Sequence, residues 1–152
     1  MHVYRLANAR RANDLSGEGA SRAGGRWNRI GTAVLYTANS RALATLEVLV
    51  HTPLAFVPDN YRMLTLNVPD DSLQSLPFDA LPEGWNSLNP PESAKRLIDE
   101  WIGENRFLVL KVPSAVVEGD FNFLINPQHT RMKEVHFIDN QPYTFDTRLF
   151  RP

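Results

Sequence analysis

The chain has no cysteine among its 152 residues, and this absence removes several kinds of chemistry at once. Without thiols there is no disulfide framework, no thiolate metal site and no cysteine nucleophile. The four histidines form no HExxH motif and no paired spacing typical of zinc, so we expect no metal. Gly-x-Gly-x-x-Gly, Walker-type and Gly-x-Ser-x-Gly motifs are also missing. Neither a Rossmann or P-loop nucleotide site nor a hydrolase with a serine elbow is therefore predicted.

Long hydrophobic runs are absent as well. No window approaches the roughly 18 apolar residues of a membrane span, and the opening residues 1–6 do not resemble a signal peptide. We therefore expect a cytoplasmic protein without a membrane partner. A hydrophobic fraction of 43% and a charged fraction of 22% are typical of a soluble globular domain, and the length suits a single one.

Neither sign of charge dominates, since the formal net charge is −1. The chain as a whole therefore has no electrostatic attraction to nucleic acid. The distribution is nevertheless uneven. Residues 1–31 carry six arginines against two acids, whereas residues 70–104 carry eight acids against two basic residues. Arginine outnumbers lysine thirteen to three, which a GC-rich genome explains. Contact with an anionic ligand is the alternative, because the guanidinium fork fits phosphate.

Short segments of alternating or continuous apolar character predict at least six strands. Residues 62–68 show the alternation clearly, with Thr65 and Asn67 between aliphatic residues. The expected strands are residues 2–6, 33–37, 62–68, 107–112, 121–125 and 134–138, with 143–150 as a candidate for the last. Strands dominate both ends of the chain and helices its middle, which predicts a mixed α+β domain.

One helix is predicted from Ser40, a favourable N-cap residue, to His51. A second is expected from the N-cap Asn89, with proline in its first turn and Glu92 at its third position. The second helix has an apolar stripe that we expect in the core, consisting of Ala94, Leu97, Ile98, Trp101 and Ile102. The glycine-bearing residues 7–32 are predicted to form a long loop, and such loops are usually functional or disordered.

Glu47 is the residue that packing explains least. It lies on the expected apolar stripe of the first helix, among Leu43, Leu46 and Val50. A carboxylate on a stripe that faces the core must be paired, protonated or beside a cavity. Arg26 is the candidate partner and a cleft between the two the candidate site, with a structural salt bridge as the alternative.

Arg26 and Tyr36 are the next candidates. Two glycines precede Arg26, which lets the backbone approach a ligand, and its guanidinium can bind phosphate through two hydrogen bonds. The alternative is an arginine stacked on Trp27 at the surface. Tyr36 ends a predicted strand and could stack on a flat ring or donate its hydroxyl, unless it is only a half-buried strand residue.

His51 and Ser114 are weaker candidates. His51 follows Glu47 by one helical turn and could hold a substrate hydroxyl or phosphate, or only stabilise the helix end. Ser114 follows a predicted strand and a proline, and could donate to a substrate amide or serve only as a turn residue. Asn122 and Asn126 flank the apolar residues 123–125, and turn chemistry explains them adequately.

Three segments together resemble the arginine, glutamate and serine sites that name the RES-domain family. They are Gly-Gly-Arg-Trp-Asn around Arg26, Ala-Thr-Leu-Glu-Val-Leu-Val-His around Glu47 and Val-Pro-Ser-Ala-Val around Ser114. The opening residues 3–6, Tyr36 in Leu-Tyr-Thr-Ala and the Asn-Pro pair at 126–127 also resemble that family. The resemblance covers essentially the whole chain, so residues 1–152 are expected to form one RES domain.

This resemblance implies an α+β fold similar to that of ADP-ribosyltransferases, with mixed sheets and flanking helices. It also implies the toxin of a bacterial type II toxin–antitoxin pair, whose antitoxin is an Xre-like protein with a helix-turn-helix domain. Members of the family consume NAD+ by hydrolysis or phosphorolysis, and some transfer ADP-ribose to a protein. NAD+ would then be a consumed substrate, and no cofactor is expected.

Cleavage of NAD+ needs a group that binds the diphosphate, a platform for a ring and a carboxylate near the ribose. Arg26, Tyr36 and Glu47 suit these catalytic roles in that order, with Ser114 and His51 as substrate contacts. A protein ADP-ribosyltransferase is the first alternative, and a non-catalytic module that binds nucleic acid or protein is the second. We expect an acidic antitoxin segment to contact residues 5–29 and no direct contact with nucleic acid, while a homodimer within the complex stays open.

Overall fold

The structure is a computed structural model that describes residues 1–53 and 55–151, and its strands in these ranges form one seven-stranded sheet. The strands are β1 His2–Asn8, β2 Leu35–Ala38, β3 Tyr61–Asn67, β4 Leu73–Ser75, β5 Val109–Pro113, β6 Phe121–Ile125 and β7 His136–Tyr143. Their order is β4-β5-β6-β2-β1-β3-β7, with β4 and β5 parallel and all other neighbours antiparallel. The predicted mixed α+β domain is confirmed.

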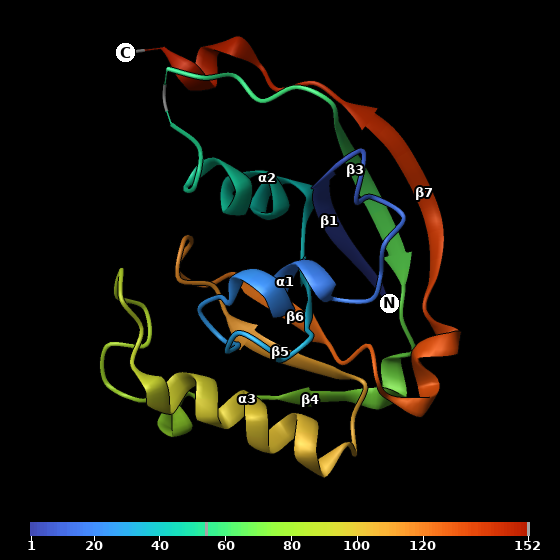
Figure 1. The fold of residues 1–152 in the computed structure, drawn as a ribbon, viewed down its shortest axis with the longest axis vertical. Helices are drawn as coiled ribbons and strands as arrows, with labels where there is room; N and C mark the ends of the chain where they lie inside the picture. Colours follow the sequence, from blue (N-terminus) through green and yellow to red (C-terminus); the bar gives the residue numbers. More distant parts are fainter. Residues whose placement is uncertain (54, 152) are drawn as a thin grey trace.

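Helices flank this sheet (Figure 1). They are α1 Glu18–Ala23, α2 Arg41–Leu49 and α3 Glu92–Glu104, and short 3-10 turns span Asp70–Ser72, Phe78–Ala80, Thr130–Glu134 and Thr147–Phe150. In the described part of the chain, no helix has the length and apolar character that crossing a membrane requires.

The starts of the two longer helices test the predicted caps. Ser40 caps α2 as expected, because its side chain accepts a hydrogen bond from the backbone N–H of Leu43. Asn89 does not cap α3: the helix begins at Glu92, and Pro91 stands at the cap position without a side-chain hydrogen bond. Each residue before a proline is held away from helical backbone angles, so two consecutive prolines delay the helix by two residues.

Three further segments differ from expectation. The loop predicted at residues 7–32 contains the end of β1 and the six-residue helix α1, which is too short to show a periodic pattern. The three-residue strand β4 was not predicted for the same reason. Residues 143–150 form no separate strand: Tyr143 ends β7, and the Asp146 carboxylate caps a 3-10 turn by accepting from the backbone of Arg148.

The alternation of side chains along the strands divides the core between the two faces of the sheet. One face carries a cluster that includes Val3, Leu35 and Ile125. The other face carries two clusters, of which one packs under α3 and includes Leu124, and the other packs under α2 and includes Leu6. In Figure 1, α2 lies beside the upper part of the sheet and α3 below its lower part. The two helices therefore share one face without meeting over its centre.

Candidate active site

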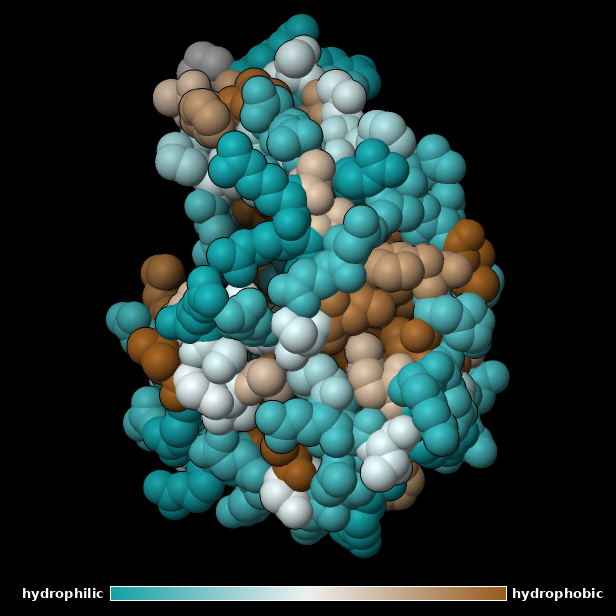
Figure 2. Space-filling view, turned by 45° about the vertical axis from the view of Figure 1, so that its right-hand side comes forward, coloured by the Kyte–Doolittle hydropathy of each residue, from teal (hydrophilic) through white to brown (hydrophobic). Residues whose placement is uncertain are grey.

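A pocket of about 670 Å³ lies on the face that α2 and α3 share. Its lining comes from β1, β2, β6, all three helices and the loops that contain residues 24–27, 88–90 and 115–116. Ligand pockets commonly measure about 300–1,000 Å³, so the size is ample for a small molecule. Figure 2 shows a recess between the upper and lower parts of the molecule. The cleft expected between Arg26 and Glu47 is present, because both side chains line this pocket.

Arg26 ties together two loops at the pocket. Its Nη1 donates to the carbonyl oxygens of Trp85 and Ser87, each at 2.7 Å. Next to it, Trp27 is buried and stacks on Trp85 with ring centroids 5.8 Å apart, so the expected alternative of Arg26 stacked on Trp27 is not adopted. Among the described residues, Nε and Nη2 of Arg26 have no hydrogen-bond acceptor, which leaves these donors for a ligand.

Tyr36 fixes the backbone around Arg26. Its hydroxyl donates to Oδ1 of Asn28 at 2.7 Å and accepts from the backbone N–H of Trp27 at 3.2 Å. Burial is the main reason that the pKa of Tyr36 lies well above its ordinary value, so the hydroxyl keeps its proton. Gly25 makes this packing possible, because a Cβ there would lie 2.8 Å from both Asn28 Oδ1 and the Tyr36 hydroxyl.

Asn28 completes this part of the pocket. It is fully buried, and its Nδ2 donates to the carbonyl oxygens of Ala20, Arg29 and Thr32 at 2.8, 3.1 and 3.0 Å. Together with the contact to Tyr36, these hydrogen bonds hold the segment after α1 in one conformation. The glycines and arginine that the sequence singled out are thus part of a rigid loop.

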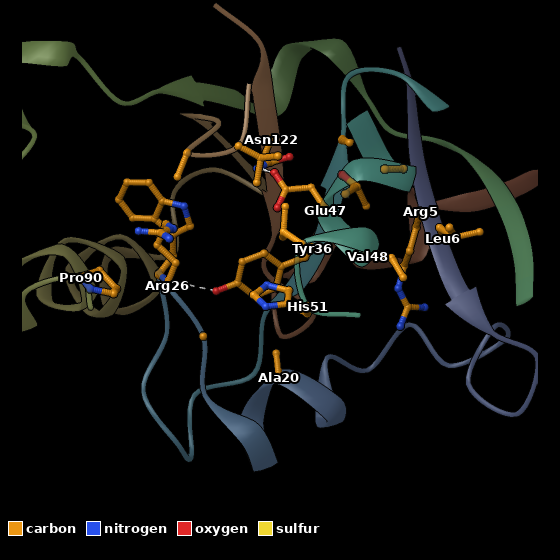
Figure 3. A pocket seen from close by; sticks show the side chains of 18 of the residues that line it. Arg5, Leu6, Ala20, Arg26, Tyr36, Glu47, Val48, His51, Pro90 and Asn122 are labelled. Carbon is orange, nitrogen blue, oxygen red and sulfur yellow. Dashed lines mark hydrogen bonds between the residues drawn. The ribbon is translucent and has the colours of Figure 1, made fainter. Parts of the chain in front are cut away.

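Glu47 enters the pocket from α2 and is half-buried. Its Oε1 accepts from Nδ2 of Asn122 at 2.7 Å and from the hydroxyl of Ser114 at 3.2 Å. Within the described ranges no protein group donates to Oε2. Figure 3 shows Glu47 beside Asn122, with Arg26, Tyr36 and His51 gathered around the same pocket. One carboxylate oxygen is therefore committed to the protein, and the other is available to a ligand.

The expected ion pair between Glu47 and Arg26 is wrong, since both side chains bind other groups. The expected apolar stripe of α2 is also partly wrong. Leu43 is buried, but Leu46 and Val50 are 38% and 54% exposed, and the buried residues of α2 run consecutively from Leu43 to Thr45. Val48 and Leu49 are only partly buried where they pack against the same cluster as Leu43, so the buried face of α2 does not pass through Leu46, Glu47 and Val50. Glu47 therefore lines a cavity.

Ser114 and His51 occupy different positions at the site. Ser114 is buried after β5, and its oxygen accepts from the backbone N–H groups of Val116 and Val117, so its proton is directed to Glu47. It does not belong to the lining, and it acts on the pocket through the carboxylate. His51 is exposed just beyond the end of α2 and lines the pocket.

Asn122 is the site residue that the sequence interpretation missed. It lies on β6, is 8% exposed, and lines the pocket while donating to Glu47. Turn chemistry does not explain it, because residues 121–125 are all in the strand. The available signal was a polar amide within an apolar strand, since a buried amide requires a hydrogen-bond partner.

The two oppositely charged regions of the sequence meet in the structure. Arg29, from the arginine-rich start, forms ion pairs with Glu92 and Asp99 of the acidic region. Arg22 pairs with Glu18 inside α1. Part of the positive charge is thus neutralised within the fold. In the described part of the chain, no three histidine, aspartate or glutamate side chains gather where they could hold a metal ion.

Comparison with solved structures finds a chain with the same fold. A chain in the crystal structure of the M. tuberculosis MbcT–MbcA toxin–antitoxin complex superimposes with a TM-score of 0.73. The match covers 98% of this chain and 86% of that one at 24% sequence identity, which shows a shared fold.

Sequence comparison defines the family. The model of the RES domain matches residues 2–146, and the chain therefore belongs to the RES domain family. A Prs ADP-ribosylating toxin of Sphingobium sp. (strain YBL2) is 37% identical over 92% of this chain and 89% of its own length. Proteins named Toxin Res are 38% identical in Pseudomonas putida, over 90% of this chain and 93% of that protein, and 32% identical in Photorhabdus laumondii, over 99% and 98%. These relatives along nearly the whole chain are toxins.

Proposed function

We propose that this chain is the toxin of a bacterial toxin–antitoxin pair and that it cleaves the nicotinamide–ribose bond of NAD+. The observation that carries the proposal is the Glu47 carboxylate. One of its oxygens is bound by Asn122 and Ser114, and the other is available in a pocket that Arg26 and Tyr36 also line. A relative named for ADP-ribosylation supports this substrate, because NAD+ is the usual donor of ADP-ribose.

The chemistry of the bond suits this group of residues. Nicotinamide is already cationic in NAD+, so it departs as a neutral molecule with the bonding electron pair and needs no strong general acid. Positive charge then develops on the ribose, and a fixed carboxylate stabilises it. In our proposal Glu47 has this role, and water or phosphate forms the new bond to the ribose carbon. An attacking water loses its proton to Glu47 or to solvent.

The remaining lining groups suit the other parts of the substrate. The free donors of Arg26 can bind the diphosphate, and the ring of Tyr36 offers a flat surface between Arg26 and Glu47 (Figure 3). Lys95 and His51 also line the pocket and add further donors for anionic or hydroxyl groups. In this proposal NAD+ is consumed as a substrate. We therefore propose that the protein acts in the cytoplasm, where this substrate is found.

Transfer of ADP-ribose to a protein is the second candidate, and the name of the 37%-identical relative favours it. The same pocket would serve, with a protein side chain in place of water. A toxin of either kind needs restraint, and the structural neighbour comes from a toxin–antitoxin complex. We therefore propose an antitoxin of the Xre-like type as a partner, with the arginine-rich residues 5–29 as its expected contact.

The test is to incubate the purified chain, free of any antitoxin, with NAD+ and to follow nicotinamide release. Glu47→Gln removes the charge at nearly constant shape, and Glu100→Gln on the exposed side of α3 is the matched control. We expect release by the wild type and the control and its loss in Glu47→Gln. Free ADP-ribose indicates hydrolysis, a phosphorylated ADP-ribose indicates phosphorolysis, and labelled protein indicates transfer. Folded wild type that releases no nicotinamide with water, phosphate or cell extract would contradict the proposal.

A further inference from the structure

We propose that Asn122 is a positioning residue that sets the orientation of the Glu47 carboxylate, so that Oε1 stays bound to the protein and Oε2 is presented to the substrate. This inference rests on the proposed function, because it assigns Asn122 a role in the same cleavage. It adds a residue that neither the arginine–glutamate–serine resemblance nor turn chemistry pointed to.

The contact between the two side chains is short and comes from a rigid part of the fold. Nδ2 of Asn122 lies 2.7 Å from Oε1 of Glu47, closer than the 3.2 Å between Ser114 and the same oxygen. Asn122 pairs with Ala38 of β2 on one side and with Val112 of β5 on the other. A side chain on an interior strand that is 8% exposed has little freedom to move. The hydrogen bond therefore ties α2 to the centre of the sheet.

The direction of the hydrogen bonds explains why both donors matter. An ionised carboxylate only accepts, so the amide must present its NH2 group to Glu47. The hydroxyl of Ser114 is equally constrained, because its oxygen already accepts from Val116 and Val117. Both donors converge on Oε1, which fixes the carboxylate plane although the glutamate side chain has three rotatable bonds. Oε2 then keeps one position in the pocket.

Asparagine is required at position 122 because its NH2 group donates a hydrogen bond to Glu47. Asn122→Asp would keep the shape but replace the amide donor by a second carboxylate, which repels Glu47 whenever both groups are ionised. Asn122→Ala would remove the donor without adding charge. A packing role would be sensitive to shape, whereas a positioning role is sensitive to the donor, and the two substitutions separate these cases.

The experiment measures kcat and KM for nicotinamide release in Asn122→Ala and Asn122→Asp, with thermal unfolding of each. We expect kcat to fall by about 10- to 100-fold in Asn122→Ala and further in Asn122→Asp, with KM within about 3-fold of the wild type. The matched control is Asn126→Ala, a buried asparagine after β6 that contacts Asn105 and is not among the pocket lining. It should lower stability and leave kcat unchanged.

A double-mutant cycle based on the free energy of unfolding tests the hydrogen bond between Asn122 and Glu47 independently of catalysis. Asn122→Ala and Glu47→Ala combined should lower stability by less than the two separate effects added together, because they share one hydrogen bond. If wild type cleaves NAD+ and folded Asn122→Ala keeps its kcat, the inference is wrong and the proposed function stands. If wild type releases no nicotinamide, the proposed function fails, and additive effects in the cycle would then reject the inference as well.

Discussion

The wall of the pocket that carries Arg26 is a pair of loops, whereas the wall that carries Glu47 is a helix held against a strand. We call the first the loop wall, which consists of residues 24–28, of Tyr36 on β2, and of the loop of residues 85–87 to which Arg26 donates. We call the second the carboxylate wall, which consists of Glu47 and Asn122 in the lining and of Ser114, which lies outside the lining and donates to Glu47. The hydrogen bonds of the loop wall mostly satisfy backbone groups, while the two that hold the Glu47 carboxylate end on one side-chain oxygen.

Because the two walls are built differently, substitutions in them should have different effects on stability and on turnover. A substitution in the loop wall leaves buried backbone groups without partners, so it should reduce stability and disturb the binding surface. A substitution in the carboxylate wall changes the orientation of one charged group and should act mainly on turnover. The predictions below test whether the two walls behave as differently as their contacts imply.

Removing the Tyr36 hydroxyl should have the largest effect on stability. Tyr36→Phe leaves Oδ1 of the fully buried Asn28 and the backbone N–H of Trp27 without their partner. We expect the free energy of unfolding to fall by about 2–3 kcal/mol in urea denaturation. Tyr61→Phe, whose hydroxyl makes no hydrogen bond with the described residues, is the control. Equal effects of the two substitutions would reject the role of Tyr36 in the loop wall.

Filling the space at Gly25 should have the next largest effect. In Gly25→Ala the new methyl group would lie 2.8 Å from the Tyr36 hydroxyl and from Oδ1 of Asn28, so the loop must shift. We expect a loss of about 2 kcal/mol by thermal unfolding. Gly103→Ala near the end of α3 meets no atom within 4 Å and should instead be neutral or stabilising. A neutral Gly25→Ala would show that the loop wall is not tightly packed.

Alkaline pH should weaken the loop wall specifically. Burial raises the pKa of Tyr36 in the folded chain above the value near 10.0 that applies when it is unfolded. The folded state therefore binds the phenol proton more tightly, and this contribution is complete below about pH 10 and is lost as pH rises further. The slope is at most about 1.4 kcal/mol per pH unit. The stability difference between wild type and Tyr36→Phe should shrink above that pH, and a constant difference would contradict this.

Ser114→Ala should have the smallest effect of the set. The substitution removes one donor to Glu47 and the acceptor of two backbone N–H groups, while Asn122 still holds the carboxylate. We expect a loss of about 1 kcal/mol in stability and a fall in kcat of less than about 10-fold. Steady-state kinetics on a sample checked by thermal unfolding measures both. A larger fall in kcat than that of Asn122→Ala would reverse the ranking of the two donors.

Local sequence patterns were sufficient for much of the fold. Ser40 caps α2 and residues 121–125 form β6 as predicted, because capping and apolar runs act between near neighbours. The same patterns placed Glu47 on a core stripe that the structure does not have. The contact between Glu47 and Asn122 joins residues 75 positions apart. Only the sheet order brings them together, so no local pattern could reveal it.

The loop wall gave a similar lesson. The residue types at Gly25 and Arg26 predict a possible ligand loop, but no local pattern indicates that Arg26 binds carbonyl oxygens 59 and 61 residues away. The six-residue α1 was hidden because a single turn and a half of helix carries no periodicity. Residue types at the pocket were thus predictable, and their partners were not.

The most direct test of the role of Glu47 compares the two walls of the pocket in one assay. We would measure kcat and KM for nicotinamide release in Glu47→Gln and in Arg26→Lys, which keeps the charge but loses the planar guanidinium. We expect Glu47→Gln to lower kcat by about 10²- to 10³-fold with little change in KM, and Arg26→Lys to act mainly by raising KM. A Glu47→Gln variant with the kcat of the wild type would contradict that role.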